Sequence, residues 1–145
     1  MGGFGEMLPD ERNHVSLDEN NLDQWGIPML HIECEHGEND LAMLDAMAMD
    51  AREILEAAGL EHIQVNSNIA PPGLLIHEMG TARMGRDPET SVVNEWGRAH
   101  DVRNLFIVDG SIFVTSGAVN PTNTIQALAL YVADRIKQNL ANLFD

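Results

Sequence analysis

Hydrophobic residues recur at helical spacing in two stretches of the chain, residues 40–58 and 121–140. Asn39 and Gly59 are the expected cap and stop of the first helix, whose apolar face is Leu44, Met47, Ala48, Ala51, Leu55 and Ala58. Asn120 is the expected cap of the second helix and Pro121 its first residue, and its apolar face is Ile125, Leu128, Ala129, Val132, Ala133 and Ile136. At a rise of 1.5 Å per residue, the second helix is predicted to be about 30 Å long.

Shorter apolar runs predict strands at residues 14–17, 28–34, 62–65 and 105–108. In 28–34, apolar and polar residues alternate, which puts Leu30, Ile32 and Cys34 on one face of a half-buried strand. The run 105–108 is apolar throughout and predicts a buried strand. The acidic stretch 18–23 between the first two strands is predicted as a loop.

The composition fits one ordinary globular domain, with 145 residues of which 44% are hydrophobic. Its 23 acidic residues against 8 Lys or Arg give a formal charge of −15, which disfavours nucleic acid and anionic membranes as partners. No apolar run approaches the ~20 residues that span a bilayer, and residues 1–10 lack the basic and apolar parts of a signal peptide. We therefore expect a soluble protein and leave its compartment, cytoplasm or periplasm, open.

Cysteine usage and known motifs exclude several classes of protein. Cys34 stands alone, so it is expected to be a small buried hydrophobe, and neither an internal disulfide nor a cysteine-rich metal site can form. The chain has no G-x-S-x-G elbow and no G-x-x-x-x-G-K-[ST] loop, and its histidines lack metal-ligand spacing. No metal site is expected, and hydrolase and nucleoside-triphosphatase functions are disfavoured.

Three segments could carry chemistry, and each also has an ordinary structural interpretation. His77 precedes a glycine-bounded stretch and could act as a general base, although a structural or surface histidine is the commoner case. Asp109-Gly110 follows an apolar run and could be either a turn or a ligand site. Asn120 and the residues after it fit helix capping, yet a helix start can also stabilise an anion. Glycines from residue 80 onward indicate close backbone approach to a ligand or another chain.

Taken in order, the motifs of the second half resemble the C-terminal region of the glucose–methanol–choline oxidoreductases. The motifs are His77-x-x-Gly80-Thr81-x-x-Met84-Gly85, Ser91-Val92-Val93-Asn94, Arg98-x-His100, Asn104-Leu105-Phe106-Ile107-Val108-Asp109-Gly110-Ser111 and Asn120-Pro121-Thr122-x-Thr124. The preceding half is similar to the family's substrate-domain segment, with weaker motifs. Asn94 and Asp101 depart from the commonest family residues and are most similar to the bacterial sugar-oxidising members.

The resemblance implies an α+β fold that forms the C-terminal part of a two-domain FAD oxidoreductase. Residues 1–76 would be an antiparallel-sheet segment of the substrate domain, 77–100 the active-site segment, and 101–145 a strand and long helix returning to the FAD-binding domain. The implied reaction is oxidation of a small alcohol or sugar, in which His77 takes the hydroxyl proton, Asn120 holds the substrate oxygen and hydride passes to FAD. Asp109, Gly110, Asn120, Pro121 and Thr122 would line the cofactor.

The chain lacks the G-x-G-x-x-G motif with which this family holds the adenine half of FAD. The resemblance therefore implies a catalytic portion that needs an N-terminal FAD-binding region or chain as partner and binds FAD weakly alone. Without that partner, we expect the apolar residues of the last strand and helix to favour self-association, namely Phe106, Ile125, Leu128 and Val132. The alternatives are a non-catalytic interaction or structural module that retains the motifs, and a histidine-based binding domain without flavin.

Overall fold

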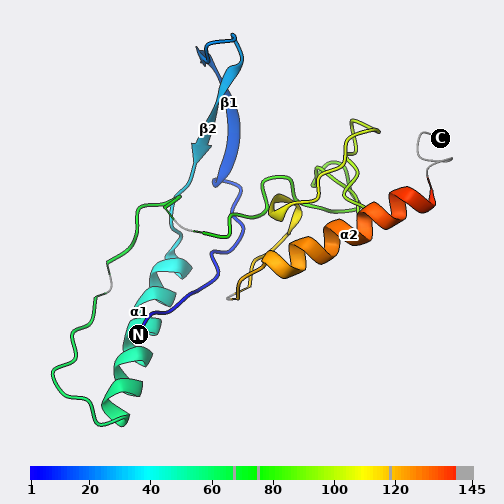
Figure 1. Cartoon of the computed structure of the whole chain (residues 1–145). Coiled ribbons are helices and arrows are strands. Elements are labelled where there is room, and N and C mark those ends of the chain that lie inside the picture. The colour runs from blue at the N-terminus through cyan, green and yellow to red at the C-terminus, as the bar shows by residue number, and fades with distance from the viewer. Residues whose placement is uncertain (67, 75, 118, 140–145) are drawn as a thin grey trace. The chain divides into compact units, whose positions relative to one another are not determined.

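The computed structural model describes residues 1–66, 68–74, 76–117 and 119–139. It is a small α+β structure with one two-stranded antiparallel sheet, two α-helices and a short 3₁₀ helix among these residues (Figure 1). The chain divides into two compact units, Met1–Leu75 and Ile76–Asp145, and each is described here by itself.

The first unit contains a β-hairpin made of β1 (His14–Leu22) and β2 (Pro28–Glu33). The prediction of a loop over residues 18–23 is wrong, because β1 continues to Leu22, with an irregularity in the pairing between Asp18 and Leu22. The turn follows at Asp23, whose carboxylate accepts hydrogen bonds from the backbone N–H groups of Trp25 and Ile27. The side chain of Asp23 thus caps the turn, and the hairpin turns at the end of the acidic stretch and not within it.

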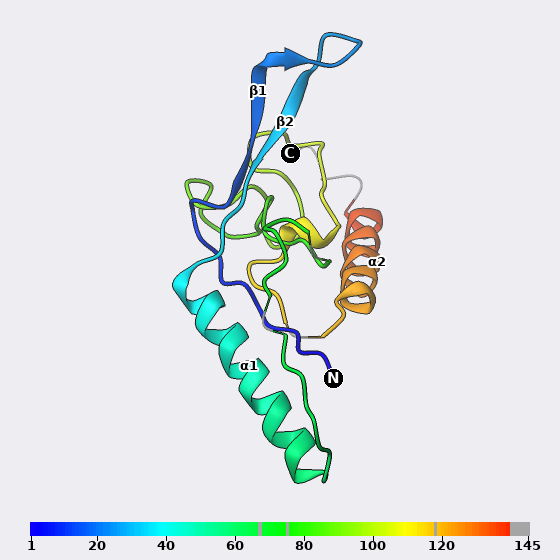
Figure 2. The ribbon, with the colours of Figure 1, turned by 90° about the vertical axis from the view of Figure 1, so that its left-hand side faces the viewer.

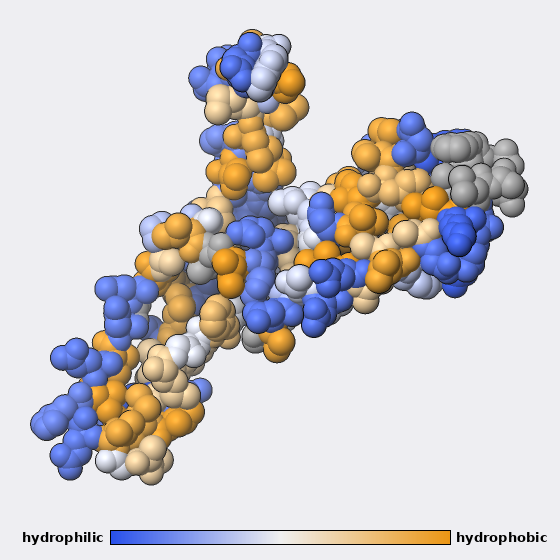
Figure 3. All heavy atoms as spheres, viewed as in Figure 1, coloured by the Kyte–Doolittle hydropathy of each residue, from blue (hydrophilic) through white to orange (hydrophobic). Residues whose placement is uncertain are grey.

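One face of the hairpin is apolar and exposed. The register pairs Val15 with Ile32 and Leu17 with Leu30, so these four side chains share a face. Leu17 is 65% exposed, Leu30 59% and Ile32 62%, which corrects the prediction of a half-buried strand. Orange, hydrophobic atoms mark the shaft of the hairpin in Figure 3.

Helix α1 (Glu38–Ala57) confirms the first predicted helix but begins earlier than expected. Its cap is Gly37, not Asn39, because the buried carboxylate of Asp40 reaches back and accepts the Gly37 N–H at 2.8 Å. The N-terminal segment lies against the Met-rich side of α1, where the sulfur of Met47 would be 2.9 Å from a Cβ placed on Gly3 (Figures 1 and 2).

Residues 62–65 do not form the predicted strand. His62 adopts a left-handed backbone conformation with φ of 58°, which breaks an extended run. Cys34 is half-buried, whereas we expected it to be buried.

The second unit is mostly irregular backbone around a small core of Val93, Ala99 and Ile112. Short backbone pairings replace a regular sheet, with isolated bridges from Val93 to Met84 and Ala99 and from Arg98 to Phe106. The predicted buried strand at 105–108 is therefore wrong: only Phe106 forms a bridge, and Leu105 is exposed.

Helix α2 (Thr122–Gln138) confirms the last predicted helix and packs through Val132, which is 1% exposed. The expectation that Val132 lies in an exposed apolar patch is wrong, because the second unit itself covers it. On the outer side of α2, Trp96 stacks on Tyr131 with ring centroids 6.0 Å apart, and the Arg135 guanidinium lies over both rings. No described helix is long and apolar enough to cross a membrane.

Candidate active site

His77 has a strained backbone conformation in the second unit. Its φ is 71°, a conformation that costs a residue with a side chain roughly 1–2 kcal/mol. The side chain is half-buried, and among the described residues it has no hydrogen-bond partner. Backbone strain of this kind at a residue with a side chain is found often at functional sites.

The segment after His77 is held by backbone hydrogen bonds to the residues that follow Asp109. The N–H of Ala82 donates to the Ser111 carbonyl at 3.0 Å, and the N–H of Met84 donates to the Ile112 carbonyl at 2.8 Å. These bonds fix residues 82–84 against the 3₁₀ helix η1 (Gly110–Ile112), although the two are far apart in sequence.

Gly110 is the point where three of the predicted segments meet. A Cβ placed on it would lie 3.2 Å from the Glu78 carbonyl oxygen and 3.3 Å from Cδ1 of Ile125 in α2. Glu78 directly follows His77, and Ile125 lies in the first turns of the helix that Asn120 precedes. The structure thus brings together the surroundings of His77, the Asp109-Gly110 segment and the beginning of α2. The glycines predicted a close backbone approach to a ligand or another chain, and at Gly110 this approach is to other segments of the same chain.

Asp109 is exposed and caps η1. Its Oδ1 accepts hydrogen bonds from the Ser111 hydroxyl at 2.6 Å and from the Ser111 N–H at 2.8 Å. Both bonds stabilise the charged carboxylate and therefore lower the pKa of Asp109, and the bond from the hydroxyl has the larger effect. Within the described chain, Oδ2 has no hydrogen-bond partner, and the side chain is exposed.

The start of α2 differs by one residue from the prediction. Pro121, not Asn120, is the cap, and its carbonyl accepts the first helical hydrogen bond, from the Ile125 N–H at 2.9 Å. Asn120 and Thr122 are exposed, and no side chain of the described residues caps the helix. The N–H groups of the first turn therefore stay open to a ligand and carry the positive end of the helix dipole.

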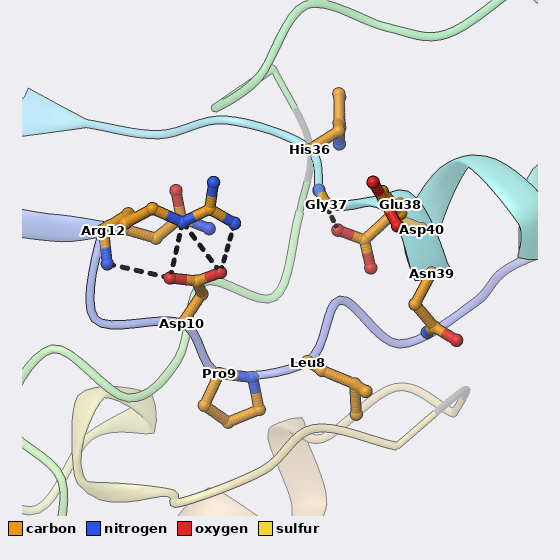
Figure 4. A pocket seen from close by; sticks show the side chains of 10 residues that line it. Leu8, Pro9, Asp10, Arg12, His36, Gly37, Glu38, Asn39 and Asp40 are labelled. Carbon is orange, nitrogen blue, oxygen red and sulfur yellow. Dashed lines mark hydrogen bonds and ion pairs between the residues drawn. The ribbon is translucent and has the colours of Figure 1, made fainter.

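Two pockets were not predicted from the sequence. The larger, about 510 Å³, lies in the first unit at the start of α1, beside the ion pair of Arg12 with Asp10 (2.6 Å) (Figure 4). Arg12 also pairs with Glu35 at 2.7 Å. The hydrogen bonds of Arg12 lower the pKa of Asp10 to about 2. Alternation and motif patterns cannot reveal such a pocket, because it depends on how residues 8–13 and 36–40 meet. The smaller pocket lies in the second unit.

The described residues contain no group of three or more His, Cys, Asp or Glu side chains that could hold a metal ion.

Comparison with known proteins identifies the class. A model of the GMC (glucose–methanol–choline) oxidoreductase family matches residues 9–129. The chain is 44% identical to the 2-methyl-1,2-propanediol dehydrogenase of Mycolicibacterium austroafricanum, covering 98% of this chain and 26% of that protein. It is 39% identical to the 6'''-hydroxyparomomycin C oxidase of Streptomyces lividus (92% and 24% covered) and 35% identical to the fructose dehydrogenase large subunit of Gluconobacter japonicus (93% and 24%). The chain therefore belongs to the GMC oxidoreductase family, and it spans about a quarter of the length of these relatives.

Proposed function

We propose that this chain is the C-terminal catalytic portion of an FAD-dependent oxidoreductase that acts on a CH–OH group of a small alcohol or sugar. The relatives named above include a diol dehydrogenase, an aminoglycoside oxidase and a sugar dehydrogenase subunit, which supports this substrate class. The observation that carries the proposal is the junction at Gly110, where the segment of His77 and the helix that follows Asn120 meet.

The residues around this junction suit the polar edge of a flavin ring. The open N–H groups of the first turn of α2 can donate to the ring's carbonyl oxygens, and their partial positive charge favours an electron-rich ring. The exposed Thr122 hydroxyl and Oδ2 of Asp109 offer a further donor and an acceptor. When bound, FAD supplies the acceptor for hydride from the alcohol carbon.

His77 and Asn120 divide the remaining work. An alcohol loses hydride more readily as its hydroxyl proton leaves, and the neutral imidazole of His77 takes that proton at a ring nitrogen. General-base assistance of this kind contributes about 10²- to 10⁴-fold to the rate. The Asn120 amide donates a hydrogen bond to the substrate oxygen and so orients it. Since a neutral amide is not a base, Asn120 does not compete with His77 for the hydroxyl proton.

The partner in this proposal is an N-terminal FAD-binding region, either joined to this chain or separate. The 145 residues contain no dinucleotide-binding motif, and the chain spans about a quarter of its relatives. We expect purified chain alone to bind FAD weakly and to self-associate through exposed apolar surface. Submicromolar, stoichiometric FAD binding by the isolated chain would contradict this part of the proposal.

The catalytic role is tested by replacing His77 with alanine in a polypeptide that joins this chain to its FAD-binding region. Turnover of the alcohol should fall by about 10²-fold or more, while the flavin absorbance per protein stays unchanged. His62→Ala is the matched control, because His62 also has a positive φ but lies in the other unit. If His77→Ala kept turnover within about threefold, the proposed base would be wrong.

A second candidate function is a non-catalytic interaction module, and the exposed apolar face of the hairpin favours it. The two functions differ in what they require. A module should keep its partner binding in the His77→Ala variant and lose it when Leu17 is replaced by aspartate. An enzyme should lose turnover in the His77→Ala variant while the flavin is retained.

A further inference from the structure

The smaller pocket of the second unit has a lining unlike the rest of this acidic chain. It measures about 250 Å³ and is lined by Asn94, Arg98, Ala99, His100 and Arg103. No acidic side chain lines it, although the sequence has 23 Asp and Glu residues against 8 Lys and Arg. None of its lining residues is among those expected to act on the substrate or to line the flavin.

The Asn94 amide and the Arg98 guanidinium offer hydrogen-bond donors to this pocket. Oδ1 of Asn94 accepts the backbone N–H groups of Trp96 at 2.9 Å and Arg98 at 3.2 Å, so its amide NH₂ is what remains for a ligand. Nε of Arg98 donates to the Arg103 carbonyl at 2.8 Å. That bond fixes the plane of the guanidinium and leaves its terminal N–H groups free to form a fork.

His100 is oriented by a chain of hydrogen bonds. The Ser91 hydroxyl donates its single proton to the Asp87 carbonyl, so it can only accept from His100 Nε2, which lies 3.0 Å away. Nε2 is therefore held by Ser91 and is not the atom that a ligand would meet. The half-buried ring is held in place before any ligand arrives.

Neither arginine of the pocket has a countercharge. Within the part of the chain that the structure describes, Arg12 and Arg52 form ion pairs with carboxylates, but Arg98 and Arg103 do not. Two arginines that line one pocket without a paired carboxylate make it electropositive, and this charge attracts an anion.

We propose that this pocket is a binding site for a small oxyanion, either a carboxylate or a phosphate. The Arg98 guanidinium has the planar fork that matches two oxygens of such a group, and charge-assisted hydrogen bonds of this kind are the strong ones. Arg103 and Asn94 line the same pocket, whose volume of about 250 Å³ fits a compact anion and not an extended polymer.

The test is calorimetric titration of the chain with inorganic phosphate and, separately, with acetate, with sodium chloride at equal ionic strength as the reference. Saturable binding at one site per chain by either anion is expected, and the tighter of the two identifies the class. Arg103→Gln should weaken it about tenfold or more, because the exposed side chain contributes charge to the site. Arg86→Gln is the control, since Arg86 is an exposed arginine of the same unit that does not line the pocket.

Amide NMR shifts on adding phosphate locate the site without any substitution. The largest shifts should fall on residues 94–103. The proposal would be overturned if neither anion showed saturable binding. It would also be overturned if both substitutions weakened binding equally or if the shifts were spread over the chain, because these results indicate a diffuse ion atmosphere or an adventitious ion only.

Discussion

Gly97 closes the turn between Asn94 and Arg98, and replacing it with alanine should destabilise the second unit strongly. Gly97 has φ of 69°, and a Cβ there would lie 2.6 Å from the Ile107 carbonyl oxygen. The Ile107 N–H donates to the Gly97 carbonyl at 2.8 Å, so the two backbones cannot separate without losing that bond. The clash is therefore with backbone and cannot be relieved by rotating a side chain.

The expected magnitude has two parts. The left-handed conformation costs alanine about 1–2 kcal/mol. Overpacking against backbone adds about 1–3 kcal/mol. Gly80→Ala provides the matched control: φ is 86°, but its Cβ would lie 3.5 Å from the Phe113 carbonyl oxygen, an ordinary contact. Because both changes are glycine to alanine, the lost freedom of the unfolded chain cancels in the comparison.

The assay is urea unfolding followed by the fluorescence of Trp96 in a Trp25→Phe background, with the free energy of unfolding compared at equal m-value. Gly97→Ala should lower the free energy of unfolding by about 2 kcal/mol more than Gly80→Ala, the excess being the overpacking cost. If the two variants were equally stable, the close approach of Gly97 to Ile107 would be refuted.

Three further predictions concern single side chains. Ser111→Ala should raise the pKa of Asp109 toward its ordinary value of 3.8, because the hydroxyl bond is the largest cause of its lowering; an unchanged carboxyl NMR titration would contradict this. Arg12→Gln should likewise raise the pKa of Asp10 from about 2. Because the pKa of Asp10 is lowered in the folded state, its contribution to stability is present above pH ~3.8 and is lost as the pH falls toward ~2. The difference in unfolding free energy between wild type and Arg12→Gln should therefore shrink at the low end of that pH window in acid-unfolding scans. Leu30→Asp should shift the isolated chain toward monomer in light scattering, since it places charge on the exposed face of the hairpin, and an unchanged mass would argue against association through that face.

Periodicity predicted both helices, because each has an apolar stripe long enough to mark a 3.6-residue repeat. Their starts were misplaced for a local reason. In α1 the buried carboxylate of Asp40 accepts the Gly37 N–H, so the helix begins before Asn39. In α2 Pro121 is the cap and not the first helical residue, so the helix begins at Thr122.

Strands were predicted less well, because pairing partners decide them. The apolar run that begins at Leu105 has the composition of a buried strand, yet only Phe106 bridges another segment. The acidic residues after Asp18 look like a loop, yet they continue β1 because Leu22 still pairs with Pro28.

The site was only partly predictable. Motif order gave the residues, but the contact of Gly110 with Glu78 and Ile125 joins segments distant in sequence, and no local pattern encodes it. The roles of His77 and Asn120 stay predictions.

The most direct test of the central claim is a double-mutant cycle of kcat on a polypeptide that contains both this chain and the proposed FAD-binding region. His77→Ala and Asn120→Ala are measured singly and together, with flavin content as the check on folding. If both side chains act on one substrate hydroxyl, each variant should lose turnover, and the double variant should lose clearly less than the product of the two single losses. Losses that multiply independently, or a single variant with turnover within about threefold of the wild type, would contradict a shared active site.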